Sequence, residues 1–170
     1  YGILDGLMMG CILSERRGGD FRILANDVFS RSPDLARVIL PISFDDTKAA
    51  AKLNLDTRAE ALRYLAAGGA VGVFPGGTVS TGARPFDPPM DPSWRTFTAK
   101  MIVKSGATVV PIYFDGRNSR LFQLASHLHA TLRVGMLIRE FRARVGTPVH
   151  VVVGEPVDPG ALAALKTDAK

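Results

Sequence analysis

The sequence predicts an α/β fold, with a mainly parallel mixed sheet flanked by helices. Short apolar, β-branched runs such as Ala107 to Phe114 alternate with segments of helical apolar spacing, such as Asp5 to Glu15. Because helices separate the strands, most neighbouring strands are expected to run parallel. No stretch has the composition of a linker, so we expect a single domain over residues 1–170.

Near the N-terminus, the pattern predicts a helix, a strand, a brief helix and a second strand. The helix over Asp5 to Glu15 is followed by two arginines and two glycines, which suit a helix C-terminus. A strand is expected over Phe21 to Ala25, and Asn26 is expected to cap the brief helix that follows. The next strand covers Arg37 to Ile42, where Pro41 favours an edge position or a strand end.

The middle of the chain has the pattern of helix, strand, loop and helix. Thr57 to Glu60 fit a capping box, which predicts a helix that begins at Thr57 and ends before Gly68 and Gly69. The apolar run Ala70 to Phe74 predicts a buried strand. The proline-rich residues 83–92 are expected to form a loop, and a helix is expected from Ser93 to Lys104.

The last part of the chain is expected to hold two strands and two helices. The strands cover Ala107 to Phe114 and Val149 to Val153, and a helix lies between them over Leu132 to Arg144. Asp158 and Pro159 predict an N-cap and first residue for a helix over Ala161 to Leu165.

The helix over 132–144 has two apolar faces. The larger one is expected to face the core and consists of Val134, Leu137, Ile138 and Phe141. Leu132 and Met136 fall on the opposite face, flanked by Arg133, Arg139 and Arg142. That face suits an anionic bilayer and an ordinary basic surface equally well.

Composition and charge exclude several classes of protein. An apolar fraction of 46% excludes a disordered chain, and no run approaches the ~20 apolar residues of a membrane span. The net charge of +5 suits an anionic membrane surface or a phosphorylated or CoA-bearing substrate. The basic residues are dispersed and not interleaved with aromatic ones, which argues against nucleic acid.

The residues that bind metals lack the spacing of a metal site. Cys11, the single cysteine, lies in an apolar run and is expected in the core. The three histidines, His127, His129 and His150, are expected at the surface or in a supporting position. We therefore expect no metal site.

The most informative motif is the glycine-rich segment Phe74-Pro75-Gly76-Gly77-Thr78-Val79-Ser80-Thr81. A buried strand that ends in such a loop presents backbone N–H groups and hydroxyls to an anion. The segment lacks the lysine of an ATP-binding P-loop. A tight turn that needs positive φ is the alternative interpretation. Candidate supplementary cations, each otherwise a solvated surface residue, are Arg84, Arg95, Lys100 and Arg117.

The chain resembles the glycerolipid (lysophospholipid) acyltransferases of the bacterial phosphatidic-acid-forming type. Phe74 to Ser80 resembles that family's Phe-Pro-Glu-Gly-Thr-Arg-Ser block, and Val109 to Phe114 resembles its later apolar strand with a central proline. Gly116 to Phe122, Leu132-Arg133 and Arg139 to Phe141 are closer still to a bacterial subgroup labelled hemolysin-like or ornithine-lipid acyltransferases. The resemblance covers nearly the whole chain.

The resemblance implies an O-acyltransferase of membrane lipid synthesis. Such an enzyme moves a fatty acyl group from acyl-CoA or acyl-carrier protein to the hydroxyl of a lysolipid, here lysophosphatidic acid or lyso-ornithine lipid. It needs no further cofactor and is expected to act peripherally, at the cytoplasmic face of a bacterial inner membrane. A non-catalytic lipid-binding domain of the same fold is the alternative.

The resemblance also assigns a catalytic role to Asp5. Family members carry a histidine followed a few residues later by an aspartate, and Tyr1 to Gly6 resembles the tail of that motif. Asp5 is then the partner of a histidine base expected just before Tyr1, and residues 1–170 alone are expected to be inactive. The residues by themselves fit a helix cap at Asp5 as well.

The acceptor head group is assigned to the glycine-rich segment and to a second segment further along the chain. The residues implied are Phe74, Pro75, Gly76, Gly77, Thr78, Ser80, Arg117 and Asn118. Asn118 and Ser119 fit turn formers equally well. Gly76 stands where the family often has Glu, and Val79 where it often has Arg. The first difference removes a carboxylate and the second a phosphate-binding cation, so the acceptor need not be a simple glycerol phosphate.

Overall fold

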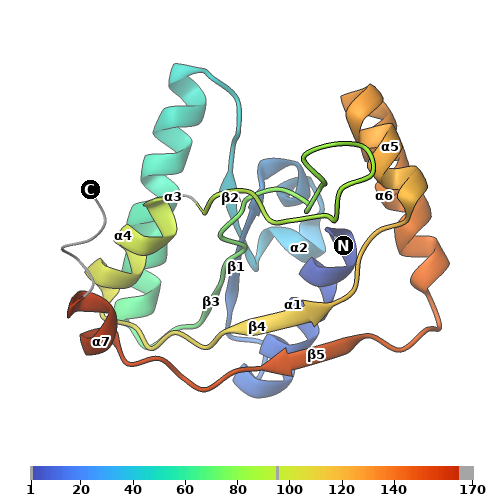
Figure 1. Ribbon diagram of the computed structural model, residues 1–170. Coiled ribbons are helices and arrows are strands. Elements are labelled where there is room, and N and C mark those ends of the chain that lie inside the picture. Colours follow the sequence, from blue (N-terminus) through green and yellow to red (C-terminus); the bar gives the residue numbers. More distant parts are fainter. Residues whose placement is uncertain (1, 95, 165–170) are drawn as a thin grey trace. The chain divides into compact units, whose positions relative to one another are not determined.

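The structure is a computed structural model that describes residues 2–94 and 96–164, which divide into two compact units. The sheet unit comprises residues 9–75, 96–109 and 157–164, and the hairpin unit comprises residues 2–8, 76–94 and 110–156. Figure 1 labels the helices and strands of both. The division falls within helix α1 (Ile3–Arg17). Each unit is described by itself below.

The sheet unit contains a three-stranded parallel sheet in the order β2-β1-β3 (Figure 1). Its strands are β1 (Arg22–Asn26), β2 (Ile39–Ile42) and β3 (Val71–Gly72). β2 lies at an edge, which confirms the position expected from Pro41. β3 is shorter than the predicted strand over Ala70 to Phe74, because only Val71 and Gly72 pair with β1 before the chain leaves the sheet.

Helix α1 packs on this sheet where the sheet has no side chain. A Cβ atom on Gly72 would lie 3.1 Å from Met9 Cγ and 3.2 Å from Leu13 Cδ1, so glycine lets the helix come close. Cys11 lies on another face of α1 and is exposed. The expectation that Cys11 belongs to the core is therefore wrong, because the helix turns Met9 inward instead.

Helix α3 (Lys48–Ala66) begins earlier than the sequence predicts. Its N-cap is Thr47, whose Oγ1 accepts a hydrogen bond from Ala50 N at 3.1 Å. Thr57 is buried within the helix, and its hydroxyl donates to the carbonyl of Pro41 at 2.7 Å. The predicted start at Thr57 is wrong because the alanine-rich turn before it is itself a strong helix former.

The core of the sheet unit lies between the sheet and helices α3 and α4. Leu24, Leu40, Ala61 and Met101 are buried together there. The other elements of this unit are η1 (Asp27–Arg31), α2 (Pro33–Ala36), α4 (Thr96–Ser105) and α7 (Pro159–Ala164).

Two predicted caps of this unit are confirmed. Asn26 Oδ1 accepts from Val28 N at 3.0 Å before η1, and Asp158 Oδ2 accepts from Gly160 N at 2.8 Å before α7. Leu165, the predicted end of the last helix, lies outside the described residues.

The hairpin unit contains a separate antiparallel pair, β4 (Ile112–Asp115) and β5 (His150–Val153). The α/β class is confirmed, whereas the expected mainly parallel sheet holds for the sheet unit only. The strand predicted from Ala107 begins only at Ile112 because Pro111 has no N–H to continue a ladder. The carbonyl of Pro111 still accepts a hydrogen bond from Gly154 N at 2.9 Å.

Two helices, α5 (Arg120–Leu128) and α6 (Ala130–Arg144), pack side by side in the hairpin unit (Figure 1). A single residue joins them: His129 ends α5 and caps α6, with its Nδ1 accepting from Thr131 N at 3.1 Å. The predicted core stripe of α6 is half wrong, because Val134 and Ile138 are 62% and 49% exposed. None of the described helices is both long enough and apolar enough to span a membrane.

Candidate functional site

The glycine-rich segment crosses the boundary between the units. Phe74 and Pro75 end a stretch of the sheet unit, and Gly76 begins a stretch of the hairpin unit, so the site is described from Gly76 onward. Gly77 has a φ of 67°, which confirms that the turn needs positive φ. A Cβ on Gly76 would lie 3.2 Å from Pro92 Cδ, so the position that carries Glu in the resembling family is packed against the following loop.

The loop after this segment is held by hydrogen bonds at both ends. Gln123, a buried residue of α5, accepts a hydrogen bond from Gly82 N at 3.1 Å. Thr81 and Met90 exchange backbone hydrogen bonds of 3.3 and 3.4 Å, and Ser80 Oγ donates to Asp91 Oδ1. The predicted loop over residues 83–92 is therefore confirmed and closed upon itself.

Arg133 of α6 contacts the glycine-rich segment directly. Its Nη2 donates to Thr78 Oγ1 at 2.9 Å and to the carbonyl of Val79 at 2.7 Å. The guanidinium carbon lies 5.9 Å from the ring centre of Phe122, which is fully buried. Burial lowers the pKa of Arg133, but an arginine side chain still keeps its proton. Arg133 therefore brings a half-buried cation to this loop. In the loop itself, Val79 stands where the resembling family often has Arg.

Sequence reasoning missed the role of Arg133. We assigned it to the outer face of α6, whereas the structure turns it inward together with Leu137 and Glu140. These three residues are separated by four and three positions and so share one helix face. Two of the three residues on this face are charged, so a pattern based on apolar residues alone could not identify it as an inward face.

A cavity of about 560 Å³ lies beside Arg133 within the hairpin unit. Its wall is mostly apolar, and its charged groups are the guanidinium of Arg133 and the carboxylates of Asp87 and Asp91. The hydroxyls of Thr78 and Thr81 belong to residues of the same wall. The remaining lining residues are Val79, Ala83, Pro88, Met90 and Pro92.

The start of α1 lies against the same loop and the same helix. A Cβ on Gly2 would lie 2.8 Å from Val79 Cγ2 and 3.2 Å from Leu137 Cδ2, so only glycine allows this approach. Asp5 Oδ2 accepts a hydrogen bond from Gly2 N at 3.0 Å and thereby caps the first turn of α1. Asp5 is the third residue of α1, and its carboxylate reaches back to the start of the helix and holds Gly2, the residue that contacts Val79.

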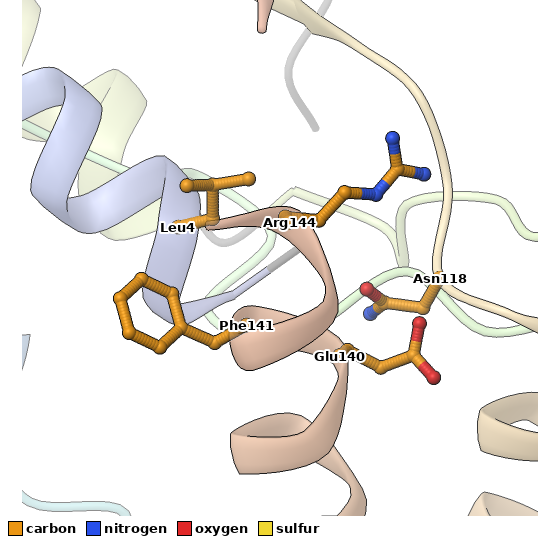
Figure 2. A pocket seen from close by; sticks show the side chains of 5 residues that line it. All are labelled: Leu4, Asn118, Glu140, Phe141 and Arg144. Carbon is orange, nitrogen blue, oxygen red and sulfur yellow. The ribbon is translucent and has the colours of Figure 1, made fainter. Parts of the chain in front are cut away.

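Asn118 lies in a second, very small pocket, which Figure 2 shows from close by. The polar ends of Asn118 and Glu140 lie on one side of it, and Leu4 of α1 and Phe141 of α6 on the other (Figure 2). Asn118 is 5% exposed, and the pocket has no room for a water molecule. We therefore interpret this pocket as packing that positions Asn118 and not as a ligand site.

Glu140 links α6 to the residue that precedes α5. Its Oε2 accepts from Ser119 N at 2.8 Å, and its Oε1 accepts from Ser119 Oγ at 2.5 Å. Ser119 Oγ also caps α5 by accepting from Phe122 N at 3.2 Å. Ser119 is thus the N-cap of a helix that the sequence analysis did not predict.

The remaining candidate cations have different positions. Arg117 is exposed, and its carbonyl accepts from Arg144 Nη2 at 3.4 Å. Arg84 is exposed on the loop, and Lys100 belongs to α4 of the sheet unit. Arg95 lies outside the described residues.

Within residues 2–94 and 96–164, no group of three or more His, Cys, Asp or Glu side chains is arranged to hold a metal ion. No protein-family model, curated protein or solved structure was found to match the chain. Its function is therefore inferred from its residues and their geometry.

Proposed function

We propose that the protein is a peripheral membrane O-acyltransferase that moves a fatty acyl group from acyl-CoA or acyl-carrier protein to the hydroxyl of a lysolipid. One observation supports this proposal above the others. Three residues on one face of α6 each contact one of the segments that resemble acyltransferases. Arg133 contacts Thr78 and Val79, Leu137 lies against Gly2, and Glu140 binds Ser119.

The proposed chemistry needs a base and a site for the acceptor. The base is a histidine, expected just before Tyr1, and Asp5 holds its tautomer and stabilises its charged form. It takes the proton of the lysolipid hydroxyl as the oxygen attacks the thioester carbonyl. The new C–O ester bond forms, the C–S bond breaks, and the proton leaves with the thiol. The thioester is already activated, so no covalent intermediate on the enzyme is required.

The acceptor's head group is proposed to bind at the glycine-rich segment. The backbone N–H groups of Gly76, Gly77 and Thr78 supply donors for an anionic group, and the Thr78 hydroxyl lies beside them. In this proposal the cavity beside Arg133 receives the rest of the head group. Its largely apolar wall suits the part of the lysolipid nearest the glycerol or amide link.

A peripheral position on a membrane fits the loop that borders this cavity. Phe86, Met90 and Trp94 are 86%, 70% and 68% exposed on the segment that runs from Gly82 to Trp94. Large exposed apolar side chains of this kind, Trp above all, favour the interface of a bilayer. The loop would then bring the cavity to its lipid acceptor.

The proposal is tested by acyl transfer with purified protein. A histidine is placed directly before Tyr1, and the chain with and without it is incubated with radiolabelled acyl-CoA and a lysolipid in vesicles that contain anionic lipid. We expect transfer only with the histidine. Transfer by the chain without it would contradict the assignment of the base. Reading what the gene encodes ahead of Tyr1 is a second test, because the proposal requires a histidine one or two positions before it.

A lipid-binding domain without catalytic activity is the competing function, and Gly76 favours it because the family's carboxylate is missing there. Binding to the vesicles without any acyl transfer, when the histidine is present, would support this alternative.

A further inference from the structure

We propose that His129 is a positioning residue for Arg133, and that protonation of its imidazole releases this arginine from the glycine-rich segment. The observation that carries the proposal is the hydrogen bond that His129 Nδ1 accepts from Thr131 N at 3.1 Å. This acceptor caps α6, whose first turn includes Arg133. The proposal is independent of the acyl transfer proposed above, because it concerns only how the chain holds one of its own side chains.

The hydrogen bond at the cap defines the protonation state of the imidazole. A ring nitrogen that accepts a hydrogen bond carries no proton, so the proton of the neutral ring of His129 is on Nε2. When a proton from solvent binds Nδ1, its lone pair is used, the ring gains one positive charge, and both ring nitrogens become donors. The imidazolium then cannot accept from Thr131 N, and this N–H group of the first turn loses its partner.

The charge of the imidazolium does not compensate for the lost cap. His129 ends α5 and begins α6, so a positive charge there lies at the negative end of one helix dipole and at the positive end of the other. These two effects have opposite signs and similar sizes. The lost hydrogen bond therefore decides the outcome. The cap stabilises α6 while the imidazole is neutral, and its contribution is lost as the pH falls and the ring takes up a proton.

The first turn of α6 connects this cap to the glycine-rich segment. Arg133 N donates to the carbonyl of His129 at 3.1 Å, so the capping residue also accepts the hydrogen bond that closes the first turn. At the end of the arginine side chain, Nη2 donates to Thr78 Oγ1 at 2.9 Å and to the carbonyl of Val79 at 2.7 Å. When the first turn frays, the backbone of Arg133 moves and its guanidinium loses these two contacts.

The other charged groups near this junction do not account for a response between pH 5 and 8. Besides His129, the charged or titratable side chains of the last turn of α5, the first turn of α6 and the cavity wall are His127, Arg133, Asp87 and Asp91. Arginine and aspartate ordinarily keep their charges across this range, whereas histidine changes its charge. His127 is exposed on α5 and does not cap α6, so it provides the control.

The test is a titration of the chain from pH 8 to pH 5, followed by nuclear magnetic resonance. At pH 8, the nitrogen signals of His129 are expected to show an unprotonated Nδ1 and a protonated Nε2. As the pH falls, the methyl signals of Thr78 and Val79 are expected to shift with the same midpoint as the imidazole. Protection of the Arg133 amide from hydrogen exchange, relative to its intrinsic rate, is expected to fall about fivefold, as for the loss of one helix cap. A proton on Nδ1 at pH 8, or methyl signals that do not follow the imidazole, would overturn the proposal.

Substitutions of the two histidines assign the response to one of them. Asn is a strong N-cap that does not titrate, so His129→Asn is expected to keep the methyl shifts of pH 8 throughout the titration. Ala cannot cap, so His129→Ala is expected to show the methyl shifts of pH 5 throughout. His127→Asn is the matched control and is expected to respond to pH like the unaltered chain. A response that persists in His129→Asn, or that disappears in His127→Asn, would contradict the assignment. If His129→Ala does not fold, the titrations of the unaltered chain and of His129→Asn still decide.

Discussion

Glu140 of α6 accepts two hydrogen bonds from Ser119, one from the backbone N–H at 2.8 Å and one from the hydroxyl at 2.5 Å. The same hydroxyl accepts from Phe122 N and caps α5. A carboxylate at this end of a helix also interacts favourably with the helix dipole. One side chain on α6 therefore fixes the beginning of α5 and, with it, the neighbouring Asn118.

Replacing Glu140 is expected to loosen this junction. Glu140→Gln keeps one acceptor but loses the charge, so we expect the free energy of unfolding to fall by about 1 kcal/mol. Glu140→Ala leaves both donors of Ser119 without this partner and is expected to cost more. Urea unfolding followed by circular dichroism measures both changes. Glu155→Gln is the control at an exposed site of the same unit, and a Glu140→Gln variant as stable as this control would contradict the prediction.

Local signals in the sequence predicted much of the fold. Asn26 and Asp158 cap the helices that they were expected to cap, because a cap depends only on residues two or three positions away. The helix start predicted at Thr57 was wrong. Its hydroxyl donates to the carbonyl of Pro41 in β2, and no local pattern reveals a partner 16 residues away. The parallel sheet followed from the alternation of helices and strands, whereas the separate β4–β5 pair depends on Pro111 and on contacts distant in sequence.

The candidate site was predictable only where a motif carried it. Gly77 was found from the glycine-rich motif and Asn118 from the resemblance, and the structure gives the first a positive φ and buries the second. Arg133 was missed because its partner Thr78 lies 55 residues away, and because an arginine on an amphipathic helix is expected to face solvent. Whether such an arginine faces solvent depends on tertiary contacts, because the hydrogen bonds that they supply offset the cost of burying its charge.

Gly82 is expected to tolerate no side chain. A Cβ there would lie 2.6 Å from the carbonyl oxygen of Asp87 and 2.8 Å from that of Arg84, and backbone atoms cannot move aside cheaply. We expect Gly82→Ala to lower the free energy of unfolding by about 2 kcal/mol and to open the loop that borders the cavity. Thermal unfolding measures the first effect, and limited proteolysis of residues 83–92 measures the second.

Gly135→Ala is the matched control for this change. Gly135 lies in the middle of α6, and nothing within 4 Å would meet its Cβ. Alanine is a better helix former than glycine, so a gain of about 0.5–1 kcal/mol is expected. Equal effects of the two substitutions would show that the close contacts at Gly82 do not matter.

Tyr64 is expected to make the sheet unit sensitive to alkaline pH. Burial and then a hydrogen bond of 2.5 Å to Asp20 raise the pKa of its hydroxyl. A raised pKa means that the folded state favours the protonated hydroxyl. The contribution of this group to stability is therefore fully present below about pH 10, the ordinary value, and is lost as the pH rises through the folded pKa.

Tyr64→Phe removes this dependence. We expect the difference in the free energy of unfolding between pH 8 and pH 11 to be smaller in this variant than in the parent chain, as measured by urea unfolding at both pH values. Tyr113→Phe is the control, because Tyr113 is 62% exposed on β4. The same pH dependence in both variants would remove Tyr64 as its source.

Substitution of Asp5 distinguishes its role as a helix cap from its proposed role as the partner of a catalytic histidine. Asp5→Asn keeps a side-chain oxygen for the hydrogen bond from Gly2 N but removes the charge, so a cap alone loses well under about 1 kcal/mol of stability. A carboxylate that orients a histidine base contributes far more to the rate, and its loss is expected to lower kcat by about 10²–10⁴-fold.

The measurement of the Asp5 variant uses the chain that carries a histidine directly before Tyr1. Acyl transfer and urea unfolding are followed on the same preparations, with Glu15→Gln as the control at an exposed acidic residue of the same helix. A large loss of kcat with nearly unchanged stability is expected for Asp5→Asn. If stability and kcat fall by the same small factor as in the control, Asp5 is a cap only. The base would then need a different partner, because an imidazolium without a nearby carboxylate lacks the charge that stabilises it.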